Sequence, residues 1–135
     1  MEDAFNMLCG DLIGEGLHRK VFECKIRPDL VVKVEEDTLR YFANVREMNF
    51  WCDHENNKKV APWLAPCEFL SPDGRVLLQK RCSPARREDA PDMIPSFFDD
   101  TKISNFGILD GKFVCVDYAI HTTTTPTRLV SAVWL

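Results

Sequence analysis

The feature that most restricts the fold of this chain is a change in the spacing of its hydrophobic residues. Residues 37–54 carry a helical spacing, and Asp37 or Thr38 is available as the cap of the expected helix. The helical stripe consists of Leu39, Phe42, Ala43, Arg46, Glu47, Phe50 and Trp51. On both sides of this segment the hydrophobic residues lie instead in short β-prone runs. This pattern predicts an α+β fold in which a sheet packs against one long helix.

Five β-prone runs are expected to form the strands of that sheet, at about residues 12–16, 21–24, 30–35, 66–70 and 75–79. Glycines and Pro28 separate the first three runs, and a turn at residues 71–74 separates the last two. Short connections of this kind join antiparallel neighbours. We therefore expect a five-stranded antiparallel sheet with one long helix within residues 1–80.

The second part of the chain, residues 81–135, is expected to be a smaller segment packed on the first as one compact unit. Three prolines between residues 82 and 99 exclude a helix of several turns there. Residues 106–109 and 112–116 flank Asp110-Gly111, a preferred two-residue hairpin turn. The apolar residues 129–135 are compatible with either a strand or a docked helix.

Composition and charge exclude several classes of protein. The chain has 135 residues, of which 45% are hydrophobic and 28% charged, so we expect a folded domain. Its net charge of −4 has the wrong sign for broad contact with nucleic acid. The sequence contains neither a secretory signal pattern nor an apolar stretch long enough to span a membrane, so we expect a cytoplasmic location without membrane contact.

The six cysteines do not form a C-x-x-C pair, and the three histidines are scattered along the chain. With no export signal, reduced and mostly buried thiols are expected rather than a disulfide framework. A structural zinc site is not expected either, because the spacing does not match a zinc pattern.

Two glycines and a lysine in the first strands are candidates for phosphate binding. Gly14 and Gly16 lack side chains that would keep phosphates away from backbone N–H groups, although two glycines are also common in an ordinary turn. Lys33 lies within an apolar run, where it is either an edge lysine that faces solvent or a buried cation that needs a carboxylate partner. Glu47 is the candidate partner: it could equally be an exposed helix glutamate, but it falls on the helical stripe with Ala43.

Oxygen ligands for a hard cation are found near the second hairpin. Asp117 follows the strand at 112–116, and Asn105 precedes the hairpin. Such ligands on rigid supports suit Mg²⁺, although Asp117 could equally be an ordinary aspartate at a strand end. Asp100, Lys102 and Asn105 form a D-x-K-x-x-N pattern, and Asp99 is an alternative for the aspartate of this pattern.

Taken in this order, these motifs resemble those of the protein kinase-like superfamily over about residues 11–119, and especially the very small kinase-like proteins of phages. The resemblance implies that residues 1–80 form a kinase N-lobe-like subdomain, and that residues 81–135 form a truncated C-lobe remnant with the catalytic loop and a hairpin. It also implies that ATP and Mg²⁺ are the cofactors. The implied ATP-binding residues are Gly14, Gly16, Arg19, Val21, Lys33 and Glu47; the catalytic residues are Asp100, Lys102 and Lys33; and the metal ligands are Asn105 and Asp117.

The chain departs from the family pattern at three places. Arg19 replaces the third glycine of the loop, where it can contact phosphate or block a close approach. Phe98-Asp99 replaces the usual His-Arg before the catalytic aspartate, and Tyr118-Ala119 replaces Phe-Gly after the metal-binding one. Few residues follow Asp117, so an activation segment and a platform for peptide substrates are not expected.

Two functions from different classes follow from this comparison. The first is a minimal ATP- and Mg²⁺-dependent phosphotransferase that acts on a protein through a Ser/Thr-type catalytic loop. The second is a kinase-fold pseudoenzyme that inhibits or regulates a partner protein, or a host protein in the host cytoplasm if the chain is phage-encoded. Nucleotidyl transfer in the same pocket is a third possibility. A partner, or a homodimer formed through the apolar tail, would supply the missing substrate surface.

Overall fold

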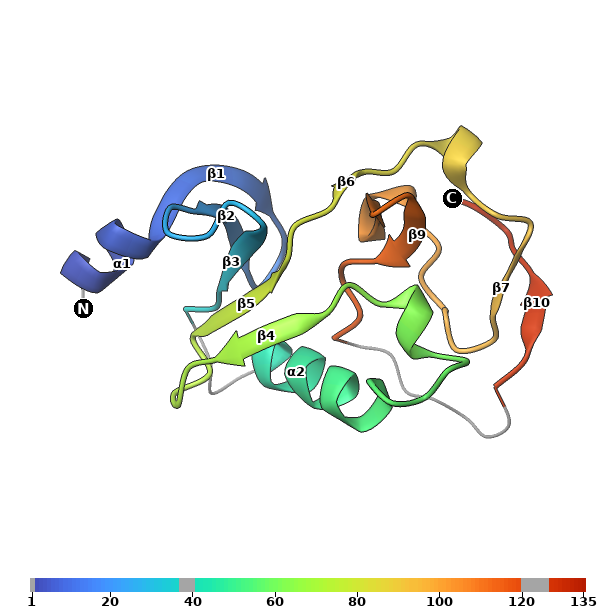
Figure 1. The fold of residues 1–135 in the computed structure, drawn as a ribbon, viewed down its shortest axis with the longest axis horizontal. Coiled ribbons are helices and arrows are strands. Elements are labelled where there is room, and N and C mark those ends of the chain that lie inside the picture. The colour runs from blue at the N-terminus through green and yellow to red at the C-terminus, as the bar shows by residue number, and fades with distance from the viewer. Residues whose placement is uncertain (1, 37–40, 120–126) are drawn as a thin grey trace.

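The computed structural model describes residues 2–36, 41–119 and 127–135. A short helix, α1 (Glu2–Leu8), leads into a five-stranded antiparallel sheet with the order β1-β2-β3-β5-β4 (Figure 1). Its strands are β1 (Cys9–Glu15), β2 (Lys20–Cys24), β3 (Leu30–Val34), β4 (Cys67–Leu70) and β5 (Val76–Lys80). The long helix α2 (Ala43–His54) packs on β4 and β5. The predicted α+β class, the five-stranded antiparallel sheet and the long helix are confirmed, whereas α1 was not expected from the sequence.

The central strand β3 carries Lys33, one of the candidate site residues. Every residue of β3 is buried, and Lys33 lies opposite Val21 of β2 and Leu77 of β5. Because both edges of β3 are paired, Lys33 is not the edge lysine that the sequence allowed. Its side chain is only 5% exposed.

Helix α2 begins at Ala43, because Phe42 takes a left-handed conformation with φ of 54°. The carboxylate of Glu35, which follows β3, accepts hydrogen bonds from the backbone N–H groups of Ala43 (2.9 Å) and Asn44 (3.0 Å). A side chain from the sheet therefore caps the helix. The predicted cap residues Asp37 and Thr38, like Leu39 of the stripe, lie outside the described residues.

The buried face of α2 is shifted relative to the predicted stripe. Ala43, Glu47 and Phe50 are buried as predicted, but Phe42 and Arg46 are exposed. The fully buried residue next to Glu47 on this face is Asn44. A polar side chain thus occupies a position where the hydrophobic pattern gave no indication of burial.

The second part of the chain contains short elements, as its prolines predicted. They are β6 (Ser83–Pro84), η2 (Arg87–Asp89), β7 (Met93–Pro95), η3 (Ile103–Asn105), β8 (Phe106–Leu109), β9 (Lys112–Cys115) and β10 (Leu129–Ser131), where η denotes a 3₁₀ helix. A further 3₁₀ helix, η1 (Ala61–Trp63), lies in the first part, between α2 and β4. The hairpin of β8 and β9 turns at Asp110 and Gly111, which have φ of 51° and 78°. Both central residues have positive φ, as the two-residue hairpin turn requires.

The C-terminal tail forms a strand rather than a helix. Strand β10 pairs antiparallel with β7, and the two lie at the opposite end of the molecule from α1 (Figure 1). Val130, Ala132 and Trp134 pack against the core, whereas Leu129, Val133 and Leu135 are exposed. Half of the apolar side chains of the tail therefore pack within the chain. A homodimer formed through the exposed half remains a prediction.

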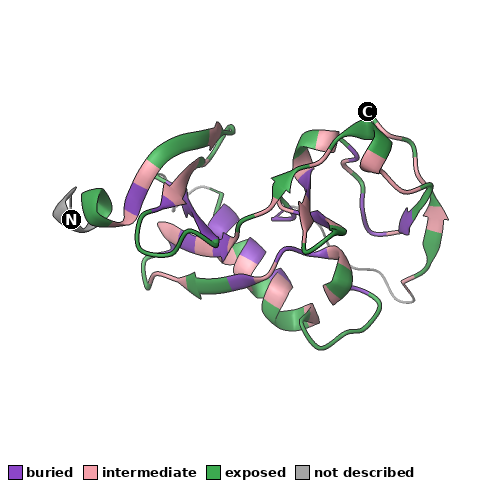
Figure 2. Cartoon of the chain, turned by 45° about the horizontal axis from the view of Figure 1, so that its top comes forward, coloured by how far each residue is buried: buried purple, intermediate pink, exposed green. Residues whose placement is uncertain are grey.

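The larger hydrophobic core joins both parts of the chain. It combines residues of α2 and β5 with residues that follow β7 and β9, including Phe50, Leu77, Phe97 and Tyr118. Figure 2 shows buried residues where the sheet, α2 and the C-terminal segments meet. This continuous packing holds the segments around residues 100 and 117 against the sheet.

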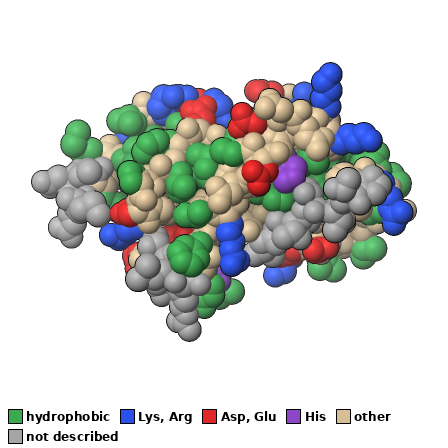
Figure 3. Space-filling view, turned by 90° about the horizontal axis from the view of Figure 1, so that it is seen from below, with side chains coloured by type: hydrophobic (Ala, Val, Ile, Leu, Met, Phe, Trp, Pro, Cys, Tyr) green, Lys and Arg blue, Asp and Glu red, His purple; other side chains and the backbone are tan. Residues whose placement is uncertain are grey.

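All six cysteines are free thiols, and four of them are buried. Within the described part of the chain, helices are too short or too polar to cross a membrane. Acidic and basic side chains are interspersed with hydrophobic ones on the face drawn in Figure 3.

Candidate functional site

A cleft of about 660 Å³ lies between the β1–β2 turn, the end of β5 and the segments that follow β7 and β9. Its walls combine glycines, aliphatic side chains, three Lys or Arg side chains and three carboxylates. The residues that line it include Ile13, Gly14, Gly16, Arg19, Val21, Val31, Lys33, Gln79, Cys82, Asp100, Ser104, Asn105 and Asp117. Chemistry-bearing residues from distant parts of the sequence therefore meet in one cavity.

The structure brings nearly all the predicted site residues to this cleft. Only Glu47 and Lys102 of that set are not among its lining residues. Glu47 is fully buried and pairs with Lys33, so it supports the lysine and does not itself line the cleft. Lys102 is exposed, and its backbone N–H donates to Oδ1 of Asp100 over 3.2 Å. Between the two candidate aspartates, Asp100 lines the cleft and Asp99 is exposed.

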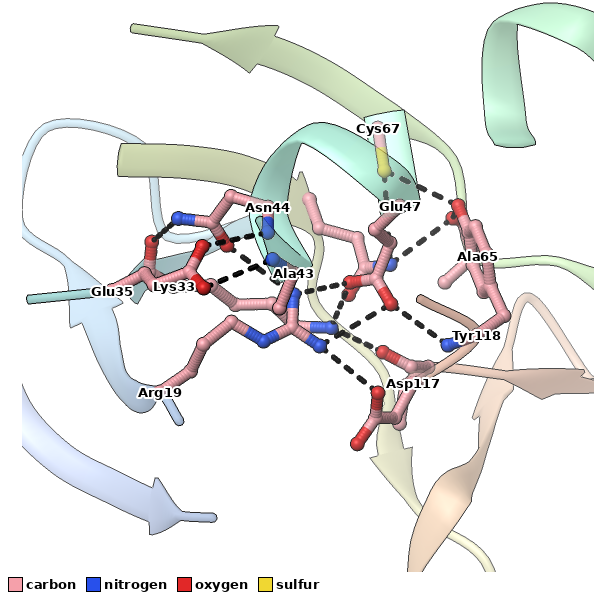
Figure 4. A network of polar contacts seen from close by, with 12 residues as sticks. Arg19, Lys33, Glu35, Ala43, Asn44, Glu47, Ala65, Cys67, Asp117 and Tyr118 are labelled. Carbon is pink, nitrogen blue, oxygen red and sulfur yellow. Dashed lines mark hydrogen bonds and ion pairs between the residues drawn. The ribbon is translucent and has the colours of Figure 1, made fainter. Parts of the chain in front are cut away.

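The Lys33 ammonium donates to Oε1 of Glu47 over 2.5 Å and to the backbone carbonyl of Val116. Figure 4 shows this contact at the centre of a polar network that joins β3, α2 and the segment after β9. Neither side chain of the pair is exposed beyond 5%. A buried ion pair of this kind fixes the position of the ammonium at the inner wall of the cleft.

The Glu47 carboxylate accepts hydrogen bonds from three directions. Besides Lys33, Arg19 donates to Oε1 (3.0 Å) and Oε2 (3.3 Å), and the backbone N–H of Tyr118 donates to Oε2 (2.7 Å). Burial raises the pKa of Glu47, but the charges and hydrogen bonds of Lys33 and Arg19 outweigh burial and lower the pKa to about 2. Glu47 is therefore an anion throughout the physiological pH range.

Arg19 reaches from the β1–β2 turn across the cleft to Asp117. Its Nη2 lies 2.9 Å from Oδ1 of Asp117, and its Nη1 also donates to Oδ1 of Asn44 over 3.2 Å (Figure 4). The Arg19 side chain is only 9% exposed, whereas that of Asp117 is 53% exposed. The arginine that departs from the family pattern thus joins the phosphate-binding and metal-binding positions expected from the sequence.

Neither Gly14 nor Gly16 is required by the fold itself. Both have ordinary negative φ values, because the positive-φ glycines of the described chain are Gly74 and Gly111. A Cβ atom at Gly14 would meet Val21 at 3.6 Å, and one at Gly16 would meet the carbonyl of Arg19 at 3.9 Å, both ordinary contacts. Since the chain has room for a side chain at both positions, the open space beside the cleft is available to a ligand.

Asn105 and Asp117 are linked through the backbone. The N–H of Val116 donates to the carbonyl of Asn105 over 2.8 Å, which places the residue before Asp117 beside Asn105. Asn105 also donates from Nδ2 to the carbonyl of Asp100 over 3.4 Å. The hairpin therefore gathers Asp100, Asn105 and Asp117 at one side of the cleft.

This donor set is of the kind that hard cations such as Mg²⁺, Ca²⁺ and Mn²⁺ prefer. Asn105 and Asp117 supply hard oxygen donors, and Mg²⁺ is commonly bound by one or two such groups together with water and substrate phosphates. In the described ranges, no group of three or more His, Cys, Asp or Glu side chains is placed to hold a metal ion alone.

Two residues of the network were missed by the sequence analysis. Asn44 is fully buried and donates from Nδ2 to the carbonyls of Lys33 (3.1 Å) and Gly74 (3.0 Å). Its position three residues before Glu47, on the same helical face, is the signal that could have identified it. Tyr118 is also fully buried, and its hydroxyl donates to the carbonyl of Ala65 over 2.7 Å.

The tail supports the segment that contains Asp100. Thr101 donates from Oγ1 to the carbonyl of Val133, and the N–H of Leu135 donates to the carbonyl of Thr101 over 3.2 Å. Trp134 packs edge-on against Phe106 and Phe113, with ring centroids 5.1 and 5.3 Å away. Residues at the end of the chain thus hold the residue next to Asp100.

No protein-family model matches the sequence, and no curated protein matches it either.

Proposed function

We propose that this chain is a minimal kinase-like phosphotransferase that binds ATP with Mg²⁺ in the cleft. The observation that carries the proposal is the buried Lys33–Glu47 pair, which fixes an ammonium in the same cavity as Asp100, Asn105 and Asp117. A fixed cation, oxygen donors for a metal and a carboxylate for a hydroxyl are the groups that phosphoryl transfer requires.

The walls of the cleft offer a place for each part of a nucleotide. Aliphatic side chains of Ile13, Val21 and Val31 line it and suit a flat base. The backbone at Gly14 and Gly16 is open to phosphates, and Lys33 supplies a positive charge for their oxygens. The nucleotide would therefore lie with its base against the sheet and its phosphates toward the hairpin.

Asn105 and Asp117 would hold Mg²⁺, which would neutralise charge on the phosphates when bound. Asp100 is the group that would orient an acceptor hydroxyl and accept its proton. Lys102, which is exposed beside Asp100, is available to an incoming substrate rather than to the bound nucleotide. A Ser or Thr hydroxyl of a protein is the proposed acceptor.

A second candidate function is that of a protein-binding pseudoenzyme on the same scaffold. The ion pair between Arg19 and Asp117 favours it, because a side chain of the protein already neutralises the carboxylate proposed to bind metal. Under this alternative the cleft would remain without a nucleotide, and the exposed surface would bind a partner.

Thermal melting with and without Mg²⁺ and ATP tests nucleotide binding. Ligand should raise the midpoint of the native chain by mass action, and Asp117→Asn should reduce that shift. Asp110→Asn is the matched control, because Asp110 is an exposed carboxylate of the hairpin turn, where asparagine also tolerates positive φ. No shift at millimolar ATP and Mg²⁺ would contradict nucleotide binding.

Transfer of label from [γ-³²P]ATP then separates the two candidates. Label on a protein substrate, or on the chain itself, supports the phosphotransferase, and Asp100→Asn should abolish it. Binding without transfer of label would favour the pseudoenzyme, and label from [α-³²P]ATP instead would indicate nucleotidyl transfer.

A further inference from the structure

We propose that Arg19 is an internal cation that takes the place of a divalent metal beside Asp117, and that it moves to the ligand phosphates when metal and nucleotide bind together. The inference rests on the proposed function, because it assigns Asp117 to the metal. It goes further in predicting that metal and nucleotide bind cooperatively and that Arg19 sets this cooperativity.

The burial of Arg19 is unusual for a loop residue. The β1–β2 turn is closed by a hydrogen bond from the N–H of Gly16 to the carbonyl of Arg19 over 2.9 Å. Within this turn Leu17 is 96% exposed, yet the Arg19 side chain is only 9% exposed. The guanidinium is thus directed toward Glu47 and Asp117 (Figure 4).

Arg19 contacts two carboxylates, Glu47 and Asp117. Glu47 is already neutralised by Lys33, at 2.5 Å, and it also accepts a hydrogen bond from Tyr118 N–H. The second cation, Arg19, therefore finds its own counter-charge in Asp117, at 2.9 Å. Lys33, Arg19, Glu47 and Asp117 carry no net charge together, and the buried carboxylate of Glu35 adds a further negative charge that acts on Arg19.

A divalent cation that bound Asp117 alone would disturb this balance. It would compete with the guanidinium for the Asp117 carboxylate and would place two positive charges beside an arginine that is nearly buried. Because Glu47 is shared with Lys33, it cannot serve Arg19 as a full replacement. Metal binding to the nucleotide-free protein is therefore expected to be weak.

Nucleotide phosphates would relieve this conflict. A guanidinium matches phosphate oxygens in geometry and charge, so Arg19 could leave Asp117 for a phosphate while remaining in the same cleft. Asp117 would then be free for the metal that accompanies the nucleotide. Each ligand would thus increase the affinity for the other, as reciprocal coupling between two sites requires.

The test measures Mn²⁺ binding to the nucleotide-free protein by isothermal titration calorimetry. It compares the native chain with Arg19→Gln and Arg46→Gln. Removal of the guanidinium should tighten the binding of Mn²⁺ alone by about tenfold, within the usual range of coupling between sites. Arg46→Gln is the matched control, because it removes an equal charge from the exposed side of α2 and should leave Mn²⁺ affinity unchanged. Adding Asp117→Asn to Arg19→Gln should abolish the gain.

Arg19→Lys provides a second test in case Arg19→Gln does not fold. A lysine keeps the charge but cannot contact both carboxylates with separate nitrogens, so a smaller gain in Mn²⁺ affinity is expected. Equal Mn²⁺ affinity of native and Arg19 variants would overturn the inference, whatever their behaviour with ATP. Conversely, a gain in Mn²⁺ affinity without a melting shift of the native chain by ATP would support the role of Arg19 and contradict the proposed function.

Discussion

Lys33 and Glu47 form a buried ion pair, with Nζ and Oε1 2.5 Å apart, that joins the central strand β3 to helix α2. The pair is asymmetric in its surroundings. Glu47 keeps a second cation, Arg19, and the N–H of Tyr118 as partners, whereas the other acceptor of Lys33 is the carbonyl of Val116. The two residues should therefore respond differently to substitution.

Glu47→Gln is expected to destabilise the chain more than Lys33→Met. The glutamine leaves Lys33 without a carboxylate partner in the interior, which should cost about 3–5 kcal/mol of unfolding free energy. After Lys33→Met, Arg19 still neutralises Glu47, so a loss of about 1–2 kcal/mol is expected. Urea denaturation measures both values.

Glu68→Gln is the control for this comparison. Glu68 pairs with Lys80 at the surface, 3.1 Å away, and both side chains are about one-third exposed. Its loss should change the unfolding free energy by no more than about 1 kcal/mol. A larger cost for Lys33→Met than for Glu47→Gln would contradict the assignment of Arg19 as a second partner.

Acid should remove the contribution of Glu47 to stability. The pKa of this carboxyl is about 2 in the folded chain, compared with an ordinary value of 4.5. Because the folded pKa is lowered, the stabilisation is present above about pH 4.5 and is lost as the pH falls toward 2, with a magnitude on the order of 3 kcal/mol.

Other carboxylates titrate in the same range, so the informative quantity is a difference. The pKa of Asp29, for example, is lowered by hydrogen bonds from Arg27 and Lys80. Unfolding free energies of the native chain and Glu47→Gln should differ at pH 6 and converge between pH 4.5 and 2. A constant difference across this range would argue against an ionised Glu47 as the stabilising group.

The elements of the sheet were predictable because local patterns determine them. The β-prone runs, the Asp110-Gly111 turn and the helical stripe around Glu47 each act over a few neighbouring residues. The start of α2 was less accessible to this reasoning. Its cap, Glu35, directly follows the preceding strand β3. Sequence rules for helix caps consider only the residues next to the helix, so they do not identify Glu35.

The contacts of the candidate site depend on tertiary packing. The sequence indicated Lys33 and Glu47 as a pair, since a lysine in an apolar run needs a counter-charge. It could not place Arg19 against Asp117, because 98 positions separate these residues and the family pattern has glycine at the position of Arg19. The burial of Asn44 was also not predicted, because polar residues are expected at the surface of a helix.

Alanine at Gly14 or Gly16 should affect ligand binding rather than folding. Both positions have room for a Cβ atom, so the unfolding free energy should change by less than about 1 kcal/mol. If phosphates approach the backbone at these glycines, the melting shift with Mg²⁺ and ATP should decrease. Unchanged ligand shifts in both variants would contradict a role in phosphate binding.

Gly107→Ala is the matched substitution with the opposite expectation. A Cβ atom at Gly107 would lie 2.7 Å from Cβ of Cys82 and 2.9 Å from the carbonyl of Ser83. The strands β6 and β8 would have to separate, which should cost about 1–3 kcal/mol. Thermal melting without ligand distinguishes it from the two loop variants.

Trp134→Ala should loosen the segment that contains Asp100. Its indole packs on Phe106 and donates from Nε1 to the carbonyl of Pro91 over 2.8 Å, so truncation should cost about 3 kcal/mol. The neighbouring bonds between the tail and Thr101 should weaken as well. Hydrogen exchange of residues 100–105 should then accelerate more than that of β3.

Val133→Ala is the control for Trp134→Ala, because it changes the tail at an exposed side chain. Val133 is 73% exposed, and its contact with Thr101 is made through its backbone carbonyl, which alanine retains. This variant should change the unfolding free energy by no more than about 0.5 kcal/mol and leave the exchange of residues 100–105 unchanged. Equal exchange in Trp134→Ala and the native chain would show that the Asp100 segment is held by the β8–β9 hairpin alone. Faster exchange only in Trp134→Ala would establish the tail as the support that positions Asp100 in the cleft.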